Sequence, residues 1–299
     1  MVHREDAEIG RSVQGRAITA VHRWTDGAED RVLVLGQMHG NEKAGVDIAR
    51  RLESVPLPAN TDLWIIPTMN PDGNAADTRV NAAGVDLNRN FAHLWVRADE
   101  GTGTFSGPAA VSEPESRAVT DFIARVQPRM TVSFHQPLFG VDTSGIPSAR
   151  WLADALADRT GLQRKDFTCS GGCHGTFTGW HNDFTAGSAV TVELGPSATA
   201  AELDRHADAV LAVADETDPA GANAIVAHWK AHDAGASPLG AVLSREYAVA
   251  GGALRDFAGG RMFWSPGTGA HAFERDESER SVSTALPHGR LAAYCLMAG

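Results

Sequence analysis

The chain has 299 residues, of which 43% are hydrophobic and 7% aromatic, a composition typical of a globular protein with room for one large domain and a small one. Its formal charge is −11, and no basic stripe is visible, so we expect no nucleic-acid partner. No apolar run approaches the roughly 20 residues that a transmembrane helix requires, so no membrane span is expected either.

The N-terminal residues MVHREDAEIGRS contain no apolar segment of the kind found in signal peptides. We therefore expect either a cytoplasmic protein or a mature protein whose leader has been removed.

Short apolar blocks alternate with segments of helical spacing along the first two thirds of the chain. The blocks, typical of strands buried on both faces, are residues 31–36, 63–68, 130–135 and 189–195. The predicted helices are residues 42–52, 112–126, 147–161 and 201–216. Ser112 and Glu115 predict a capping box at the start of the second helix. This alternation predicts an α/β domain with a mostly parallel or mixed central sheet and helices on both faces.

The composition changes near residue 218, where ETDPAGANA reads as a domain boundary. We expect a first domain over residues 1–218 and a small β-rich module with a tail over residues 219–299. Glycines in 239–273 predict hairpins and turns. Three aromatic residues in this segment are interpreted as the core of the module rather than as a ligand platform: Phe257, Phe263 and Trp264.

A histidine and a glutamate follow the first apolar block in the stretch QMHGNEKAG. A turn alone does not require His39 and Glu42 together, but zinc takes imidazole nitrogen and carboxylate oxygen as ligands. In open α/β sheets, ligands gather at the carboxyl ends of strands. His135 ends the block MTVSFH and is the expected third ligand.

Glu193 lies near the end of AVTVELG and adds one further carboxylate at the same edge of the sheet. This residue suits the role of general base, taking a proton from the attacking water and passing it to the leaving nitrogen.

Polar residues fill the stretch MNPDGNAADTRVNAAGVDLNRNF between the second and third expected ligands. Asn70 to Gly73 read as a turn, with Gly73 free to take a positive φ. Asn88 and Arg89 can together hold a carboxylate, and Arg79 can meet an oxyanion.

In their order along the chain, HGNE, NPDG, GVDLNRNF, SFHQP and TVELG resemble the zinc carboxypeptidase family over roughly residues 8–215. The resemblance implies one Zn²⁺ bound by His39, Glu42 and His135, with Glu193 as general base. It also implies further roles: Asn88 and Arg89 hold the substrate's terminal carboxylate, Arg79 stabilises the oxyanion, and Asp86 orients a histidine ligand.

Residues 161–192 lack the tyrosine that pancreatic-type members carry shortly before the base. The stretch GTFTGW (175–180) instead resembles the bacterial murein peptide amidase branch, which implies a small murein-derived peptide as substrate. The candidates for substrate specificity lie before Glu193: Thr176, Thr178, Trp180 and His181.

The segment 239–273 resembles an LGFP repeat of bacterial cell-envelope proteins, which implies cell-wall association through these residues. Cys169 and Cys173 read as a disulfide or two free thiols rather than a zinc site, because their C-x3-C spacing has no second half. The module and the cysteine pair favour an extracellular or cell-wall location.

Two other functions compete with a peptidase. One is an N-acyl amino acid deacylase of the same superfamily, disfavoured because the run GVDLNRNF is intact. The other is a cell-wall binding protein with a silent catalytic fold, disfavoured because neither a ligand nor the base is missing.

Overall fold

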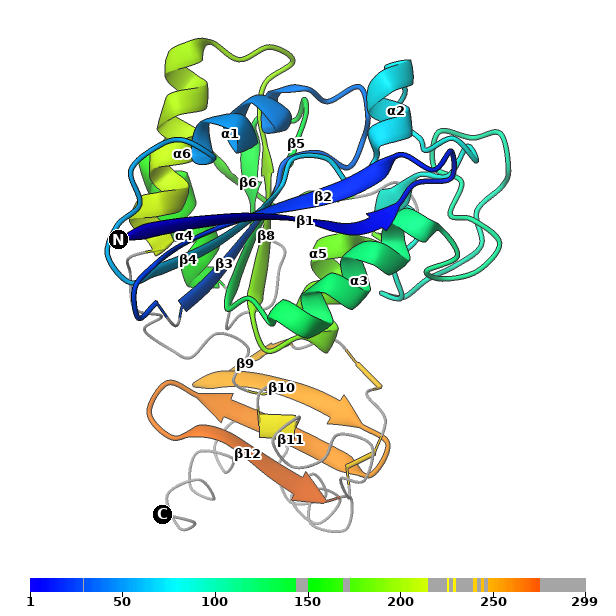
Figure 1. The fold of residues 1–299 in the computed structure, drawn as a ribbon. Helices are drawn as coiled ribbons and strands as arrows, with labels where there is room; N and C mark the ends of the chain where they lie inside the picture. The colour runs from blue at the N-terminus through cyan, green and yellow to red at the C-terminus, as the bar shows by residue number, and fades with distance from the viewer. Residues whose placement is uncertain are drawn as a thin grey trace.

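The computed structural model describes residues 1–28, 30–143, 150–168, 173–214 and 247–274, together with residues 225, 228–229, 239–240 and 243–244. Within these residues the chain forms an eight-stranded mixed sheet flanked by helices and a separate four-stranded sheet (Figure 1). The predicted α/β class is confirmed.

The larger sheet has the strand order β1-β2-β4-β3-β5-β8-β6-β7. Its four central strands pair in parallel and correspond to the four apolar blocks of the sequence. The hairpin β1–β2 adds antiparallel strands at one side, and β6 pairs antiparallel to β8 at the other. The strands are β1 Val2–Arg11, β2 Ala17–Thr25, β3 Asp30–Leu35, β4 Thr61–Ile66, β5 Met130–His135, β6 Gly140–Asp142, β7 Arg164–Lys165 and β8 Ser188–Glu193.

Helices cover both faces of this sheet, as the sequence predicts. Helices α1, α4 and α6 bury their apolar residues against one face, and α3 and α5 pack on the other. The helices are α1 Ala44–Leu52, α2 Pro71–Ala76, α3 Pro114–Val126, α4 Arg150–Thr160, α5 Phe177–Phe184 and α6 Ala200–Ala214. A short 3₁₀ turn, η1, spans Leu87–Arg89.

The predicted capping box is wrong. Helix α3 begins at Pro114, which needs no hydrogen-bond acceptor for its nitrogen, and Glu113 rather than Ser112 occupies the N-cap position. The side chain of Ser112 donates instead to Glu113 Oε1 at 2.8 Å.

The predicted turn at residues 70–73 is also wrong. Asn70 caps helix α2, and its Oδ1 accepts a hydrogen bond from the backbone nitrogen of Gly73 at 2.9 Å. Pro71 occupies the first turn of this helix, where its fixed φ is favourable. The same residue types therefore start a helix, and Gly73 does not adopt a positive φ.

The C-terminal sheet consists of consecutive antiparallel hairpins, in agreement with the sequence. Its strands are β9 Tyr247–Val249, β10 Gly252–Phe257, β11 Gly260–Ser265 and β12 Gly269–Glu274. Phe257, Phe263 and Trp264 are buried, which confirms that they are core residues. The predicted domain boundary near residue 218 lies outside the described residues. No helix in the described part of the chain is long and apolar enough to cross a bilayer.

Candidate metal centre and substrate cavity

The carboxyl ends of three parallel strands carry the chemically active residues. His39 follows β3 by four residues, His135 is the last residue of β5, and Glu193 is the last residue of β8. His135 and Glu193 are direct partners in the parallel register. Residues far apart in sequence therefore meet at one edge of the sheet, as expected for this type of fold.

The loop between β3 and α1 is held by hydrogen bonds within itself and to α2. Gln37 Nε2 donates to the carbonyl oxygens of Gly40 and Glu42, and Asn70 Nδ2 donates to that of Met38. A Cβ at Gly40 would lie 1.9 Å from the carbonyl carbon of Gly73, so only glycine allows the loop to pack against α2. This packing fixes the positions from which His39 and Glu42 project.

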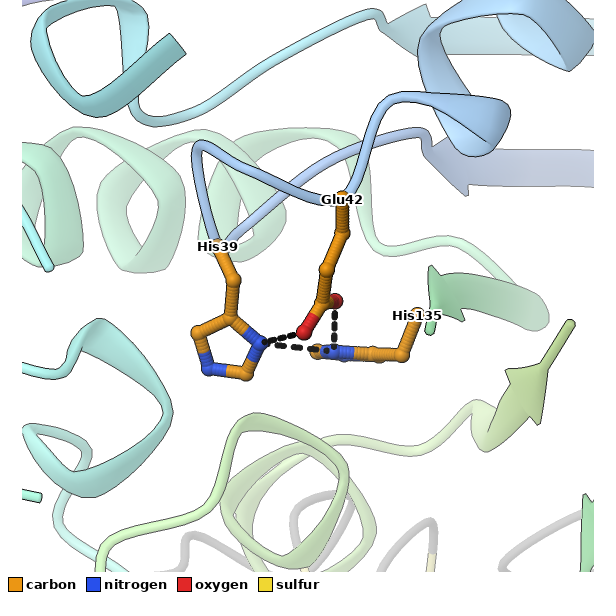
Figure 2. Close-up of side chains that lie close together, drawn as sticks. All are labelled: His39, Glu42 and His135. Atoms are coloured by element: carbon orange, nitrogen blue, oxygen red, sulfur yellow. Dashed lines mark hydrogen bonds and ion pairs between the residues drawn. The ribbon is translucent and has the colours of Figure 1, made fainter. Parts of the chain in front are cut away.

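His39, Glu42 and His135 point toward a common centre (Figure 2). His39 Nδ1 lies 2.8 Å from Glu42 Oε1, and His135 Nδ1 lies 3.2 Å from Glu42 Oε2. The two Nδ1 atoms are 3.3 Å apart. All three side chains are buried, and one donor atom from each lies within 4.8 Å of the others. These three residues could hold a metal ion.

The outer nitrogen of each imidazole has its own partner. His39 Nε2 lies 3.0 Å from Asp86 Oδ1, and His135 Nε2 lies 3.1 Å from Ser133 Oγ. When these outer nitrogens donate, both Nδ1 atoms present lone pairs to the common centre. Two nitrogens and a carboxylate are also the donor set of many catalytic zinc sites, so the residues present fit zinc.

Asp86 connects the candidate metal centre to the residues expected to bind substrate. It is completely buried, and besides His39 it accepts hydrogen bonds from Arg79 Nη2 at 2.9 Å and from the backbone nitrogen of Asn88 at 2.9 Å. Burial raises the pKa of Asp86, but the hydrogen bond from His39 and the charges of His39, Arg79 and Arg89 outweigh it and hold the pKa far below its ordinary value. The carboxylate therefore stays ionised.

Glu42 is likewise held ionised. Burial raises its pKa, but hydrogen bonds from His135 and His39 outweigh burial and lower the pKa to about 2. For His39, burial lowers the pKa, and Asp86 and Glu42 together outweigh it and raise the value. The carboxylate of Glu42 thus offers a stable negative charge to a cation.

The pKa of Glu193 is raised, unlike the pKa values of Asp86 and Glu42. Burial raises its pKa and outweighs the nearby His135 and the hydrogen bond that the Leu138 nitrogen donates to Oε2 at 3.2 Å, while the charge of Glu42 raises the pKa further. A carboxylate with a raised pKa accepts a proton more readily, as a general base must.

A cavity of about 270 Å³ adjoins the metal centre. Of the candidate metal-binding, catalytic, substrate-binding and specificity residues named from sequence, seven line it: His39, Arg79, Asn88, Arg89, Thr176, Thr178 and Glu193. The sequence missed His93, Asp142, Asn182 and Thr191, which also line it. Thr191 is the first residue of the motif TVELG, so its place beside Glu193 could have been found, whereas His93, Asp142 and Asn182 belong to no motif or spacing that indicates the site.

The three polar residues expected to contact substrate are positioned by short-range contacts. Arg79 is held by Asp86 and by the carbonyl oxygen of Gly103, with Nη1 3.5 Å from Glu42 Oε1. Asn88 Oδ1 accepts a hydrogen bond from the Phe177 backbone nitrogen at 2.9 Å. Because the side-chain oxygen of Asn88 is engaged in this way, its NH₂ group is left to donate. Arg89 Nη1 donates to the carbonyl oxygen of Asn88 at 2.7 Å.

Two specificity candidates do not line the cavity: His181 lies in the core, and Trp180 is partly buried against it. His181 is fully buried, with Nε2 2.9 Å from Thr131 Oγ1 and Nδ1 2.8 Å from Thr185 Oγ1. Trp180 packs beside Phe91 and Phe177. Both residues therefore stabilise helix α5.

Cys173 also lines the cavity and is disulfide-bonded. Cys169 lies outside the described residues, so its pairing with Cys173 stays a prediction.

The sequence profile of the zinc carboxypeptidase family matches residues 5–137, and that of the LGFP repeat matches residues 239–278. Murein peptide amidase A of Vibrio campbellii is 31% identical over 202 residues, which cover 62% of this chain and 78% of the relative. Murein peptide amidase A of Escherichia coli K12 is 34% identical over 137 residues, covering 42% of this chain and 57% of that relative.

Solved structures share the fold of this chain. The murein-tripeptide amidase of Escherichia coli O157 superposes with a TM-score of 0.59 at 25% identity, over 71% of this chain and 92% of the other. Carboxypeptidase A of Helicoverpa armigera shares the fold, with a TM-score of 0.58 at 20% identity over 71% and 70% of the two chains. The chain belongs to the zinc carboxypeptidase family, and it contains an LGFP repeat over residues 239–278.

Proposed function

We propose that the protein is a zinc-dependent peptidase of carboxypeptidase type that releases the C-terminal residue of a short murein-derived peptide. The observation that carries the proposal is the convergence of His39, Glu42 and His135 beside a cavity that also contains Glu193, Asn88 and Arg89. Similarity to the two murein peptide amidases supports the substrate class.

His39, Glu42 and His135 would hold one zinc ion, which supplies a Lewis acid for the scissile carbonyl and for the attacking water. Their supporting contacts to Asp86 and Ser133 keep the donor atoms in place.

Substrate binding begins at the C-terminal carboxylate. The NH₂ group of Asn88 and the guanidinium of Arg89 donate to this group, and the charge-assisted hydrogen bonds fix the peptide's end in the cavity. A peptide with a blocked C-terminus loses these bonds and leaves the Arg89 charge unpaired.

Glu193 takes a proton from the attacking water and passes it to the leaving nitrogen. The raised pKa of Glu193 favours the first transfer, and the same carboxyl group is then placed to protonate the amine. Arg79, beside Glu42 at the metal centre, stabilises the negative charge that develops on the carbonyl oxygen.

The cavity suits a released residue with a polar side chain. Asp142, His93, Thr176, Thr178 and Thr191 add carboxylate, imidazole and hydroxyl groups to its lining. Diaminopimelate carries both an ammonium and a carboxylate at the end of its side chain, so it offers partners to such a lining. We further propose that the C-terminal LGFP repeat, residues 239–278, associates with the cell wall and brings the enzyme to this substrate.

The proposal is tested by measuring how purified, zinc-loaded protein turns over three substrates. These are L-Ala-γ-D-Glu-diaminopimelate, an ordinary peptide ending in an L-residue, and an N-acyl amino acid. We expect cleavage of the murein peptide that is lost on chelation and restored by zinc. Preferential turnover of the acyl amino acid would instead make the protein a deacylase. No turnover of any of the three would contradict the enzymatic proposal and favour a wall-binding protein.

A further inference from the structure

Arg255 is an arginine on the apolar face of the C-terminal sheet. Its side chain is only 1% exposed, and it shares a strand face with Ala253 and Phe257 and a register position with Met262, all of which are buried core residues. A buried guanidinium is costly unless it meets an opposite charge, so the partner of Arg255 matters to the fold.

Among the described residues, Arg255 meets a carboxylate of the larger domain. Arg255 Nη2 lies 3.5 Å from Asp183 Oδ1, and Arg255 Nε donates to the carbonyl oxygen of Ser244 at 3.1 Å. Asp183 lies in the last turn of α5, and the C-terminal sheet lies on the side of the larger sheet that α3 and α5 cover (Figure 1). The ion pair therefore joins the two sheets through a helix that lines the substrate cavity.

Asp183 lies between the side chains of Arg255 and His93. Its Oδ2 lies 2.6 Å from His93 Nδ1, and both side chains are buried. Negative charge near the C-terminal end of a helix is disfavoured by the helix dipole, so Asp183 depends on its partners. His93 in turn lines the cavity.

His93 belongs to the segment that carries the proposed carboxylate-binding residues. A Cβ at Gly179 would lie 2.4 Å from His93 Cδ2, so the imidazole packs directly on the backbone of α5. The carbonyl oxygen of His93 accepts from the Gly175 nitrogen at 2.6 Å, and the Phe91 nitrogen donates to the Gly175 oxygen at 3.0 Å.

The same loop is fixed at its start. The Phe177 nitrogen donates to Asn88 Oδ1, so the residues before and within α5 hold both ends of segment 88–93. A shift of His93 would therefore move Asn88 and Arg89 relative to the metal centre.

We propose that Arg255 is a positioning residue for the substrate cavity: it fixes Asp183, Asp183 fixes His93, and His93 holds the segment that carries Asn88 and Arg89. The C-terminal sheet is thus part of the structure that supports the substrate site, whatever else it binds. The kinetic form of this inference rests on the proposed peptidase function.

The test compares full-length, zinc-loaded variants on the murein tripeptide. Arg255→Gln and Asp183→Asn should each raise KM by about three- to tenfold with kcat within about twofold, the range expected when a positioning hydrogen bond or ion pair is lost. Arg255→Lys should recover most of the effect. Arg261→Gln removes a half-exposed arginine of the same sheet, paired only locally with Asp256, and should behave as the parent protein.

The double variant Asp183→Asn/Arg255→Gln distinguishes a direct coupling from two separate effects. Because removing both partners of a buried pair is less damaging than leaving one charge alone, its KM should rise less than the product of the two single effects. A rise in KM equal to the product of the two single effects would overturn the proposal. An unchanged KM in a folded Arg255→Gln protein would overturn it as well. If Arg255→Gln fails to fold, Asp183→Asn and Arg255→Lys carry the same test.

Hydrogen exchange gives a second measurement that needs no turnover. Arg255→Gln should increase amide exchange in residues 88–93 and 175–184, and Arg261→Gln should not. If the parent protein cleaves no peptide, the proposed function fails while this exchange pattern still decides the positioning role. Unchanged exchange in both segments would overturn that role.

Discussion

His39 and Asp86 are joined by a hydrogen bond of 3.0 Å between two buried side chains. Because Asp86 also holds Arg79 and the backbone of Asn88, one carboxylate orients a metal-centre imidazole and the polar groups that face the substrate. Loss of the charge at this position should therefore affect metal and substrate together.

Asp86→Asn should weaken zinc binding by about 10- to 100-fold, the usual effect of removing a carboxylate that orients a ligating histidine. Competition with a chromogenic chelator measures this directly. Asp47→Asn removes a carboxylate that is half exposed and pairs with Arg50, and it is the matched control. Equal zinc affinity in the Asp86 and Asp47 variants would show that Asp86 does not support the metal centre.

Arg89→Gln should reduce kcat/KM for peptides with a free C-terminus by about 10- to 100-fold, because a charge-assisted hydrogen bond is lost. The same peptides with a C-terminal amide should be poor substrates for both proteins and should be affected little by the substitution. The ratio of the two rates is the quantity to measure. A ratio that does not change in the variant would place carboxylate recognition elsewhere.

Gly40→Ala should destabilise the protein, because its Cβ would lie 1.9 Å from the backbone of Gly73 and neither backbone can yield cheaply. We expect a loss of about 1–3 kcal/mol in the free energy of unfolding, with weaker zinc binding because the loop that carries His39 shifts. Urea denaturation with and without zinc measures both effects. Gly267→Ala, at a site with open space around it, is the control. Equal stability of the two variants would rule out the proposed loop packing.

His206 predicts a pH-dependent stability. Burial, helped by the charge of Arg205 and opposed by that of Glu202, lowers its pKa from 6.5 to about 4, so the folded state resists protonation that the unfolded state accepts. Its contribution to stability is complete above pH 6.5 and is lost as the pH falls toward 4, on the order of 3 kcal/mol in all. His206→Gln should flatten the stability profile between these values. A difference profile that is independent of pH would contradict the assignment.

The parallel core and the clustering of His39, Glu42 and His135 could be predicted from sequence because their signals are local. Buried strands read as continuous apolar runs, and His135 and Glu193 end such runs. The capping box failed because Pro114 offers a better helix start than Ser112, and the turn at 70–73 failed because Asn70 caps a helix as readily as it starts a turn.

The contacts around His93 could not be predicted, because no spacing links residues 93, 183 and 255. His93 follows the motif GVDLNRNF without belonging to it, and Arg255 in a small β module reads as an ordinary surface residue. Only the fold shows that their side chains meet through Asp183. The burial of His181 could have been predicted more easily, because Phe177 and His181 are four residues apart and so share one face of α5.

The most direct test of the central claim is single-turnover cleavage of the murein tripeptide by zinc-loaded Glu193→Gln, with metal content measured in the same sample. We expect one zinc ion per chain, as in the parent protein, and a rate lowered at least 100-fold, because the proton acceptor is gone while the metal ligands remain. Full activity in a protein with normal zinc content would contradict the role of Glu193 and the mechanism built on it.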